Sequence, residues 1–348
     1  MSAWNSISEN HHFRQTSLYR SFREIPLHFL DAGAAGGIHD LVKGAASIID
    51  CVCFEPEKEA ARALRLQYGQ ESPFASMTIL ETALSGRAGQ RTLHVTRSAV
   101  NTSLLAPEED LIKRYHLPGF HVDKTTTIAT ESLDGLMLRE GRSGRRFGEF
   151  VKLDCQGAEY EIIQGAEKIL RENCIAIMCE VEFFPLYKDQ KCFSELDHFL
   201  RAKKFQLYGL YPHYISAKSL NRREAETEER LLWADALYFK DPLHNRRAGA
   251  DIDQRGVDAL LVVALLTRYY DFALELSRAF FSDKADLPHL ELLIQELSGA
   301  DKREMERDVS GLIADCQRNP DLLYLLAKKF IDCHRSNSDI DFIEVKKV

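Results

Sequence analysis

The chain is organised around the stretch Phe29-Leu30-Asp31-Ala32-Gly33-Ala34-Ala35-Gly36-Gly37, where an apolar run ends in an acid and a turn of small residues follows. A second apolar run, Cys51-Val52-Cys53-Phe54-Glu55, ends in an acid as well. A strand, a tight turn, a helix and a second strand with a terminal acid are typical of a nucleotide-binding unit. The two runs therefore predict a cradle of nucleotide size near the start of the chain.

Strands and helices alternate from Pro26 to about Lys240. The expected strands are 27–32, 47–54, 77–84, 91–96, 150–154, 175–183, 205–211 and 236–240. The expected helices are 38–44, 58–68, 158–172 and 193–203. This alternation predicts an α/β fold with a Rossmann-like, doubly wound and mostly parallel sheet. The remainder of the chain has a helical pattern and predicts an all-helical appendage.

Composition divides the chain into three regions. We expect residues 1–25 to form a lid or a surface segment, residues 26–245 the main domain, and residues 250–348 a helical region. Helix breaks are expected near Asp283, Gly299 and Pro320. The arginine-rich loop 140–148 predicts a solvated connector, or a contact with an acidic substrate.

Charge and hydropathy exclude some classes of protein. The formal net charge of −8 argues against a nucleic-acid partner. The longest apolar run, 259–266, is far shorter than the roughly 20 residues of a membrane span. The start of the chain lacks the apolar segment of a signal peptide, and the eight cysteines are expected to be mostly buried, reduced thiols. We therefore expect a cytoplasmic protein.

The turn distinguishes between two cofactors. NAD and FAD carry a pyrophosphate, and their binding sites use the spacing G-x-G-x-x-G, whose second glycine is Ala35 in this chain. S-adenosylmethionine has no phosphate, so small residues with an acid before the turn and another at the next strand end suit it. Asp31, Gly33, Gly37 and Glu55 fit that description, and a carboxylate can accept hydrogen bonds from both ribose hydroxyls. Glu55 can also be read as a solvated acid at a strand end.

A segment in the middle of the chain makes the prediction more specific. The stretch 150–159 (FVKLDCQGAE), followed by Ile162-Ile163-Gln164-Gly165-Ala166, resembles the signature of the FkbM family of S-adenosylmethionine-dependent methyltransferases. Further similar motifs occur in the family's order: Asp31 to Ala34 with Gly37, Phe54-Glu55-Pro56, Thr82-Ala83-Leu84-Ser85 with Gly89, Asn101-Thr102-Ser103-Leu104, Ser132-Leu133-Asp134 and Cys179-Glu180-Val181-Glu182.

The resemblance implies a methyltransferase that moves a methyl group from S-adenosylmethionine to a hydroxyl group of a sugar, glycan or natural product. It assigns the cofactor to Asp31, Gly33, Ala34, Gly37, Glu55, Thr82, Ala83, Asn101, Ser103 and Asp154. Two positions depart from the family pattern. Ala35 replaces an asparagine, and Gln156 replaces a glutamate that could act as a charged base or metal ligand.

Methyl transfer needs an acceptor held in line and benefits from a general base. We expect Asp154, Lys152 and Glu180 to be catalytic, because they lie on strands whose carboxyl ends carry the site in such folds. Lys152 and Asp154 can also be read as a structural ion pair. Glu182 shares a strand face with Glu180, and one of the two is expected at the site.

Other site assignments stay open from the sequence. Glu159 is either a helix cap or a functional acid, and His213 is either a base or part of a packed loop. A divalent metal on Asp154 with Glu180 or Glu182 is conceivable, but no metal-specific spacing supports one.

Three functional hypotheses remain, which are the methyltransferase, a non-catalytic interaction module with the same fold, and an NAD-dependent enzyme. Gln156 and the helical tail motivate the second, and Ala35 disfavours the third. The apolar positions of the tail are expected to pack on the catalytic domain or to form a homodimer interface. These are Leu260, Leu261, Leu265, Tyr269 and Phe272.

Overall fold

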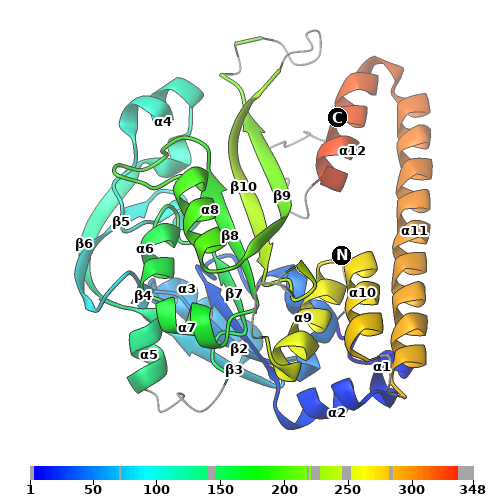
Figure 1. The fold of residues 1–348 in the computed structure, drawn as a ribbon. Coiled ribbons are helices and arrows are strands. Elements are labelled where there is room, and N and C mark those ends of the chain that lie inside the picture. Colours follow the sequence, from blue (N-terminus) through cyan, green and yellow to red (C-terminus); the bar gives the residue numbers. More distant parts are fainter. Residues whose placement is uncertain are drawn as a thin grey trace.

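A seven-stranded sheet forms the centre of the molecule (Figure 1). The structure is a computed structural model that describes residues 4–69, 72–139, 146–217, 219–220, 228–244, 252–281 and 285–335. The strands are β1 (Leu27–Ala32), β2 (Ile49–Phe54), β3 (Ser76–Leu80), β7 (Phe150–Leu153), β8 (Ala176–Glu182), β9 (Gln206–Ile215) and β10 (Arg230–Phe239). Their order is β3-β2-β1-β7-β8-β10-β9, and only β10 runs antiparallel to its neighbours. The predicted mostly parallel, doubly wound sheet is confirmed.

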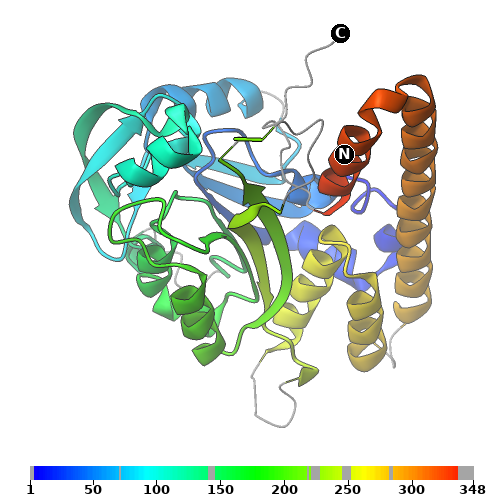
Figure 2. The ribbon, with the colours of Figure 1, turned by 90° about the horizontal axis from the view of Figure 1, so that it is seen from above.

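Residue alternation along the strands separates two hydrophobic layers. In β1, Leu27 and Phe29 belong to one buried cluster, whereas Leu30 and Ala32 belong to the other. Four helices cover the second face (Figure 2): α5 (Leu133–Arg139), α6 (Glu159–Gln164), α7 (Glu167–Glu172) and α8 (Phe193–Ala202). The first face is covered by α3 (Lys58–Tyr68), the 3₁₀ segment η1 (Asp40–Ile48) and helices from the end of the chain.

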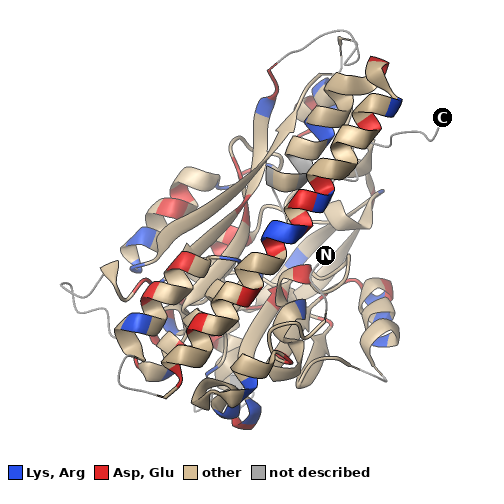
Figure 3. Ribbon diagram, turned by 90° about the vertical axis from the view of Figure 1, so that its right-hand side faces the viewer, with Lys and Arg blue, Asp and Glu red and all other residues tan. Residues whose placement is uncertain are grey.

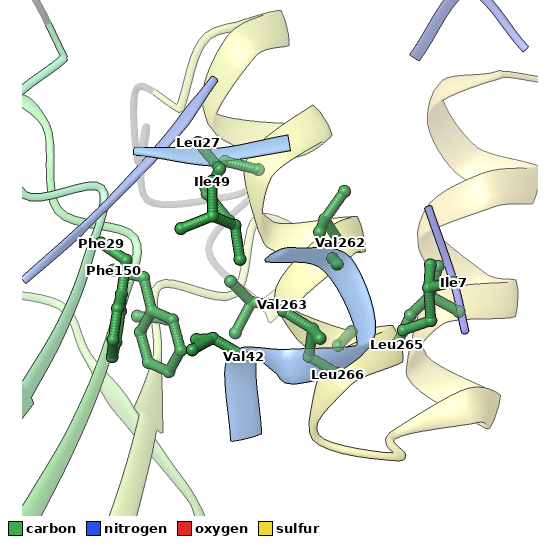
Figure 4. Packing of buried hydrophobic residues seen from close by; sticks show 14 of the residues in the cluster. Ile7, Leu27, Phe29, Val42, Ile49, Phe150, Val262, Val263, Leu265 and Leu266 are labelled. Atoms are coloured by element: carbon green, nitrogen blue, oxygen red, sulfur yellow. The ribbon is translucent and has the colours of Figure 1, made fainter. Parts of the chain in front are cut away.

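The C-terminal helices are α9 (Gln254–Leu266), α10 (Tyr270–Phe280), α11 (Leu287–Arg318) and α12 (Leu323–Arg335). Every side chain from Ala259 to Leu266 is buried, because α9 lies between the sheet and the outer helices. Val263 of α9 belongs to the same buried cluster as Phe29 and Phe150 of the sheet (Figure 4). The helical region therefore shares one hydrophobic core with the sheet.

The N-terminal segment contributes to the same layer. Its helices α1 (His11–Gln15) and α2 (Ser17–Glu24) bury Phe13 and Phe22. The backbone N–H of Ser17 donates to Asp286 Oδ1 at 3.0 Å, next to the start of α11. Arg255 of α9 donates to Glu149 Oε1 at 2.7 Å and to the backbone oxygen of Ile25 at 3.0 Å. Both ends of the chain thus close the same face of the sheet.

A second, three-stranded sheet lies beside the carboxyl ends of the main strands. Its strands β4 (Ala83–Leu84), β6 (Val122–Glu131) and β5 (Gly89–Thr96) pair in that order, and α4 (Glu109–Tyr115) follows β5 along the chain. The expected strand 77–84 is therefore two strands, β3 and β4, in different sheets. The strand β6 had no counterpart among the sequence predictions.

Three helix predictions were wrong in detail. The expected helix 158–172 divides into α6 and α7, because the backbone leaves helical geometry at Ala166, with a φ of −121° and a ψ of 20°. The expected break at Gly299 is absent, since α11 is continuous from Leu287 to Arg318. The expected helix 38–44 is the 3₁₀ segment η1. The expected break at Asp283, most of the loop 140–148 and the side chain of Cys333 lie outside the described residues.

The outer end of the tail is more polar. Acidic and basic residues both occur along α11 (Figure 3), and its distal half has no buried side chain. Within the described ranges, no helix combines the length and hydrophobicity needed to cross a bilayer. Cys51, Cys53, Cys174 and Cys179 are buried and free.

Candidate active site

The turn after β1 needs glycine at two positions. Gly33 has a φ of +85°, and a Cβ there would lie 1.8 Å from the backbone oxygen of Asp154. Gly37 has a φ of +107°, which also disfavours a side chain. Gly36 faces open space, and a Cβ added there would have no neighbouring atom within 4 Å. The turn after β1 is therefore in direct backbone contact with the end of β7.

A cavity of about 570 Å³ lies at the carboxyl ends of the strands, on the sheet face that α9 covers further along. Most of the residues predicted for the site line it: Gly33, Gly37, Glu55, Thr82, Ala83, Asn101, Ser103, Lys152, Asp154 and Glu180. Ala35 and Gln156, the two departures from the family pattern, line it as well. Asp31 and Ala34 are fully buried behind this wall. Residues 4–25 do not contribute to the lining.

A buried lysine connects the two central strands. Asp31 and Lys152 are register partners on β1 and β7, and Lys152 Nζ lies 3.5 Å from Asp31 Oδ1 and 3.3 Å from Asp154 Oδ2. Burial lowers the pKa of Lys152, but the carboxylates of Asp154 and Asp31 outweigh it and raise that pKa above its ordinary value. The ammonium group therefore stays charged and holds both carboxylates. The other oxygen of Asp31 accepts the backbone N–H of His39 at 3.2 Å.

Gln156 joins the remaining acids into a chain of hydrogen bonds. Its Nε2 donates to Asp154 Oδ1 at 2.9 Å and to Glu180 Oε2 at 2.8 Å, while its Oε1 accepts the Tyr187 hydroxyl at 2.7 Å. The amide donates both of its hydrogens to carboxylates. In this arrangement of side chains, position 156 therefore requires an uncharged hydrogen-bond donor. Burial, followed by the charge of Asp154, raises the pKa of Glu180 well above its ordinary value.

The backbone places Gln156 in this position through an unusual conformation. Gln156 has a φ of +54° and Gly157 a φ of +95°, so two consecutive residues adopt left-handed geometry after β7. The Ser103 hydroxyl donates to the Gln156 backbone oxygen at 2.6 Å and so fixes the turn. The turn after β7 therefore holds the Gln156 side chain against the strand ends.

Glu55 lies at the end of β2 with only 4% of its surface exposed. Its Oε1 accepts the backbone N–H of Glu57 at 2.8 Å. Burial raises the pKa of Glu55 to about 7. A carboxylate that is both buried and at the cavity wall is suited to bind paired hydroxyl groups.

Comparison with known families identifies the fold's relatives. The model of the methyltransferase FkbM domain matches residues 31–207, about half of the chain. The chain belongs to the FkbM methyltransferase family. No curated protein matches it.

Two solved structures resemble this FkbM family member. An FkbM methyltransferase from Methylobacillus flagellatus KT has 14% sequence identity and a TM-score of 0.36. That likeness covers 62% of this chain but only 43% of the relative, so the chain spans less than half of that protein's length. A candidate tRNA (m1A22) methyltransferase from Streptococcus pneumoniae has 7% identity and a TM-score of 0.30, and the likeness covers 82% of this chain and 98% of the relative.

Some acids of the FkbM motifs lie away from the cavity. Glu159 is 3% exposed and its Oε1 accepts the backbone N–H of Cys155 at 2.6 Å, which fits a structural cap of the turn. Glu182 is 1% exposed, and burial raises its pKa to about 7. Asp134 accepts the backbone N–H groups of Lys168 and Ile169 at 2.8 and 3.0 Å, and so caps α7. Within the described residues, no cluster of three or more His, Cys, Asp or Glu side chains is arranged to hold a metal ion.

The cavity also contains residues of this FkbM family member that the sequence did not single out. Trp233 and Asp235 on β10 and His39 after the first turn line it, and Tyr187 anchors Gln156 from behind. Apolar side chains from the small sheet and the segments around it also line the cavity: Leu93, Val100, Leu104, Leu117 and Phe120. Burial lowers the pKa of His39, and the charge of Lys152 lowers it further.

Proposed function

We propose that this protein is an S-adenosylmethionine-dependent O-methyltransferase that acts on a hydroxyl group of a sugar, glycan or natural product. One observation carries the proposal: a single cavity joins the glycine turn and Glu55 at β1 and β2 to the Lys152, Asp154, Gln156 and Glu180 cluster at β7 and β8. Ligands of such sheets bind where the strand order reverses, which is between β1 and β7 here.

The residues at the first end of the cavity suit the cofactor. Glycine or alanine at every position from 33 to 37 keeps the side chains of the turn small, and buried Glu55 offers a carboxylate for two ribose hydroxyls. When bound, the cofactor supplies a methyl group on a positively charged sulfur. Thr82, Ala83, Asn101 and Ser103 would form the wall around it. We assign Asp31 and Ala34 a supporting role from behind the turn, since both are fully buried.

The second end suits an acceptor that must be held in line with the methyl group. Asp154 would orient the acceptor, because Lys152 and Gln156 fix both of its carboxylate oxygens. Lys152 would supply positive charge, and Glu180 would accept a hydrogen bond from a second hydroxyl. Gln156 is compatible with this activity, since it forms three side-chain hydrogen bonds that keep the acids in place.

Calorimetry with S-adenosylmethionine and S-adenosylhomocysteine tests cofactor binding directly. Transfer is then measured as radioactive methyl from S-adenosylmethionine appearing in methyl glucoside, methyl mannoside or methyl rhamnoside. We expect binding of both cofactor forms and transfer to at least one glycoside. Binding of neither form would refute the proposal, and binding without transfer would favour the non-catalytic module.

The proposal includes a homodimer through the C-terminal helices. Met305, Val309 and Ile313 are exposed at four-residue spacing on α11, as a helix face that pairs with a second copy would be. Sedimentation of the full chain should give twice the monomer mass, and Ile313→Asp should return the monomer. A wild-type monomer at high protein concentration would remove this part of the proposal.

A further inference from the structure

We propose that His213 is the general base that takes the proton of the acceptor hydroxyl, with Trp233 holding its ring in place. This inference rests on the proposed function, because it needs a hydroxyl acceptor and S-adenosylmethionine. His213 and Trp233 are register partners on β9 and β10, and both line the cavity. They lie on the acceptor side, separated from the glycine turn by β7 and β8.

The ring of His213 is held in place by stacking, and one of its nitrogens has no hydrogen-bond partner among the described residues. Its ring stacks on Trp233 with centroids 5.0 Å apart and an interplanar angle of 16°. Its Nε2 is buried, and no described residue forms a hydrogen bond with it. Asp235 Oδ2 lies 4.0 Å from that nitrogen, close enough to stabilise the ring once it is protonated. The stack therefore fixes the imidazole while one of its nitrogens has no hydrogen-bond partner among the described residues.

The charged groups at the ends of β7 and β8 are engaged with one another. Lys152 is held as an ammonium by Asp31 and Asp154, so it has no lone pair to offer. Asp154 and Glu180 each accept a hydrogen bond from Gln156. Burial lowers the pKa of His213, which keeps the ring neutral near physiological pH, as a base must be.

The proton and electron pairs balance in the proposed step. The acceptor O–H bond breaks, and its proton forms a bond with Nε2 of His213. The oxygen electron pair forms the new bond to the methyl carbon, whose bond to sulfur breaks with its electrons left on sulfur. The protonated ring then faces Asp235 until the proton leaves to solvent.

Trp233 provides a spectroscopic readout of this histidine. The chain has two tryptophans, Trp4 and Trp233, so Trp4→Phe leaves one indole to observe. A protonated imidazole quenches a stacked indole, and the fluorescence of Trp233 should therefore fall as the pH is lowered. We expect the midpoint to lie below the ordinary histidine value of about 6.5 and to disappear in His213→Gln. A midpoint above about 7.5, which would leave the ring protonated at neutral pH, would overturn the inference.

Kinetics separate this inference from the proposed function. With a methyl glycoside that the wild type methylates, His213→Gln should lower kcat by about 100-fold or more and remove the rise of rate with pH, while calorimetric affinity for S-adenosylmethionine stays unchanged. His198→Gln, at an exposed position on α8, is the matched control. Wild-type kcat and pH profile in His213→Gln would refute the base while leaving the methyltransferase intact. Absence of transfer by the wild type to every glycoside would instead refute the proposed function, and with it this step.

Discussion

Gln156 and Glu180 are joined by a hydrogen bond of 2.8 Å between the amide nitrogen and Oε2. The same nitrogen donates to Asp154, so one uncharged side chain separates two carboxylates. The family pattern has a glutamate here, and in this chain that residue would place a third carboxyl group between the other two. The amide of Gln156 therefore suits this arrangement of acids, because it bonds to two carboxylates without adding a third.

Gln156→Glu tests this relationship through stability. Two donated hydrogen bonds are lost, and the introduced carboxyl group must carry a proton to replace even one of them. We expect the free energy of unfolding to fall by about 2–4 kcal/mol at alkaline pH and by less at acidic pH, because protonation relieves the repulsion. Urea unfolding at several pH values measures this. Gln164→Glu, at an exposed helix end, should have little effect at any pH, and an equal loss in both variants would contradict the assignment.

The turn after β1 gives a test of steric fit. Gly33→Ala would place a methyl group 1.8 Å from the Asp154 backbone oxygen at a φ of +85°, so we expect a loss of more than about 2 kcal/mol of stability. Gly36→Ala is the matched control from the same turn, because its Cβ would face open space. Its stability should stay within about 0.5 kcal/mol of the wild type. Similar melting temperatures for the two variants would show that the turn is not held against β7.

Glu55 predicts a pH dependence of cofactor binding. Its pKa is raised to about 7 by burial, so the free protein carries a protonated carboxyl below that pH. Binding to ribose hydroxyls favours the ionised form, and affinity for S-adenosylmethionine should therefore rise as the pH increases to about 7 and level off above it. Glu55→Gln should lose about 10-fold or more in affinity above that pH and remove the dependence.

Glu55 affects stability and cofactor binding in opposite directions as the pH rises. A raised pKa in the folded state means that folding disfavours ionisation, so Glu55 lowers the free energy of unfolding as the pH rises from about 4.3 towards 7. Glu55→Gln should therefore lose less stability than the wild type across that interval. Glu59→Gln, at an exposed position on α3, serves as control for both measurements. Identical pH profiles in wild type and Glu55→Gln would remove Glu55 from the cofactor site.

Lys152→Met should be strongly destabilising. It leaves Asp31 and Asp154 without their shared cation, and breaking a buried ion pair costs about 3–5 kcal/mol. Lys203→Met removes a lysine from an exposed pair with Glu167 and should cost at most about 1 kcal/mol. The two variants are compared by urea unfolding. A small loss in Lys152→Met would mean that the carboxylates have another partner.

Truncation tests the shared core. A chain that ends at residue 244 would expose the sheet face under α9, including Phe29 and Phe150, so we expect it to lose cooperative unfolding. A chain that ends at Arg318 lacks residues 319–322, α12 and the residues after it, and none of the described side chains from 319 to 335 is buried. Calorimetric melting should distinguish the two. A cooperative transition in the shorter chain would show that the sheet folds without α9.

The sequence predicted the parts of the fold that have a continuous apolar pattern. The strands β1 and β8 and the helix α3 lie where expected, because their buried faces consist of consecutive or periodically spaced apolar residues. The strand β6 was missed because threonines and charged residues fill it and most of its side chains are exposed. The helix α11 passes Gly299 despite a cost of about 1 kcal/mol for glycine, since the neighbouring helix formers outweigh it.

The family motifs predicted part of the cavity lining. The motif residues Glu55, Lys152, Asp154 and Glu180 do line one cavity. Asp31 and Ala34 lie behind its wall instead, a distinction that depends on side-chain direction at the start of a turn. Trp233 and Asp235 could not be found this way, since they enter the cavity only because β10 pairs antiparallel with β8.

The core closed by both chain ends has a consequence for biosynthesis. Ile7 and Phe22 are translated before the strands of the sheet, and Leu290 and Ile294 are translated after them, yet all four belong to one buried cluster. The strands β1 and β2 are made long before α9, the helix that covers them. A nascent chain of this protein therefore holds an apolar sheet face uncovered until α9 has been translated, and in that interval chaperones or slow aggregation keep it foldable.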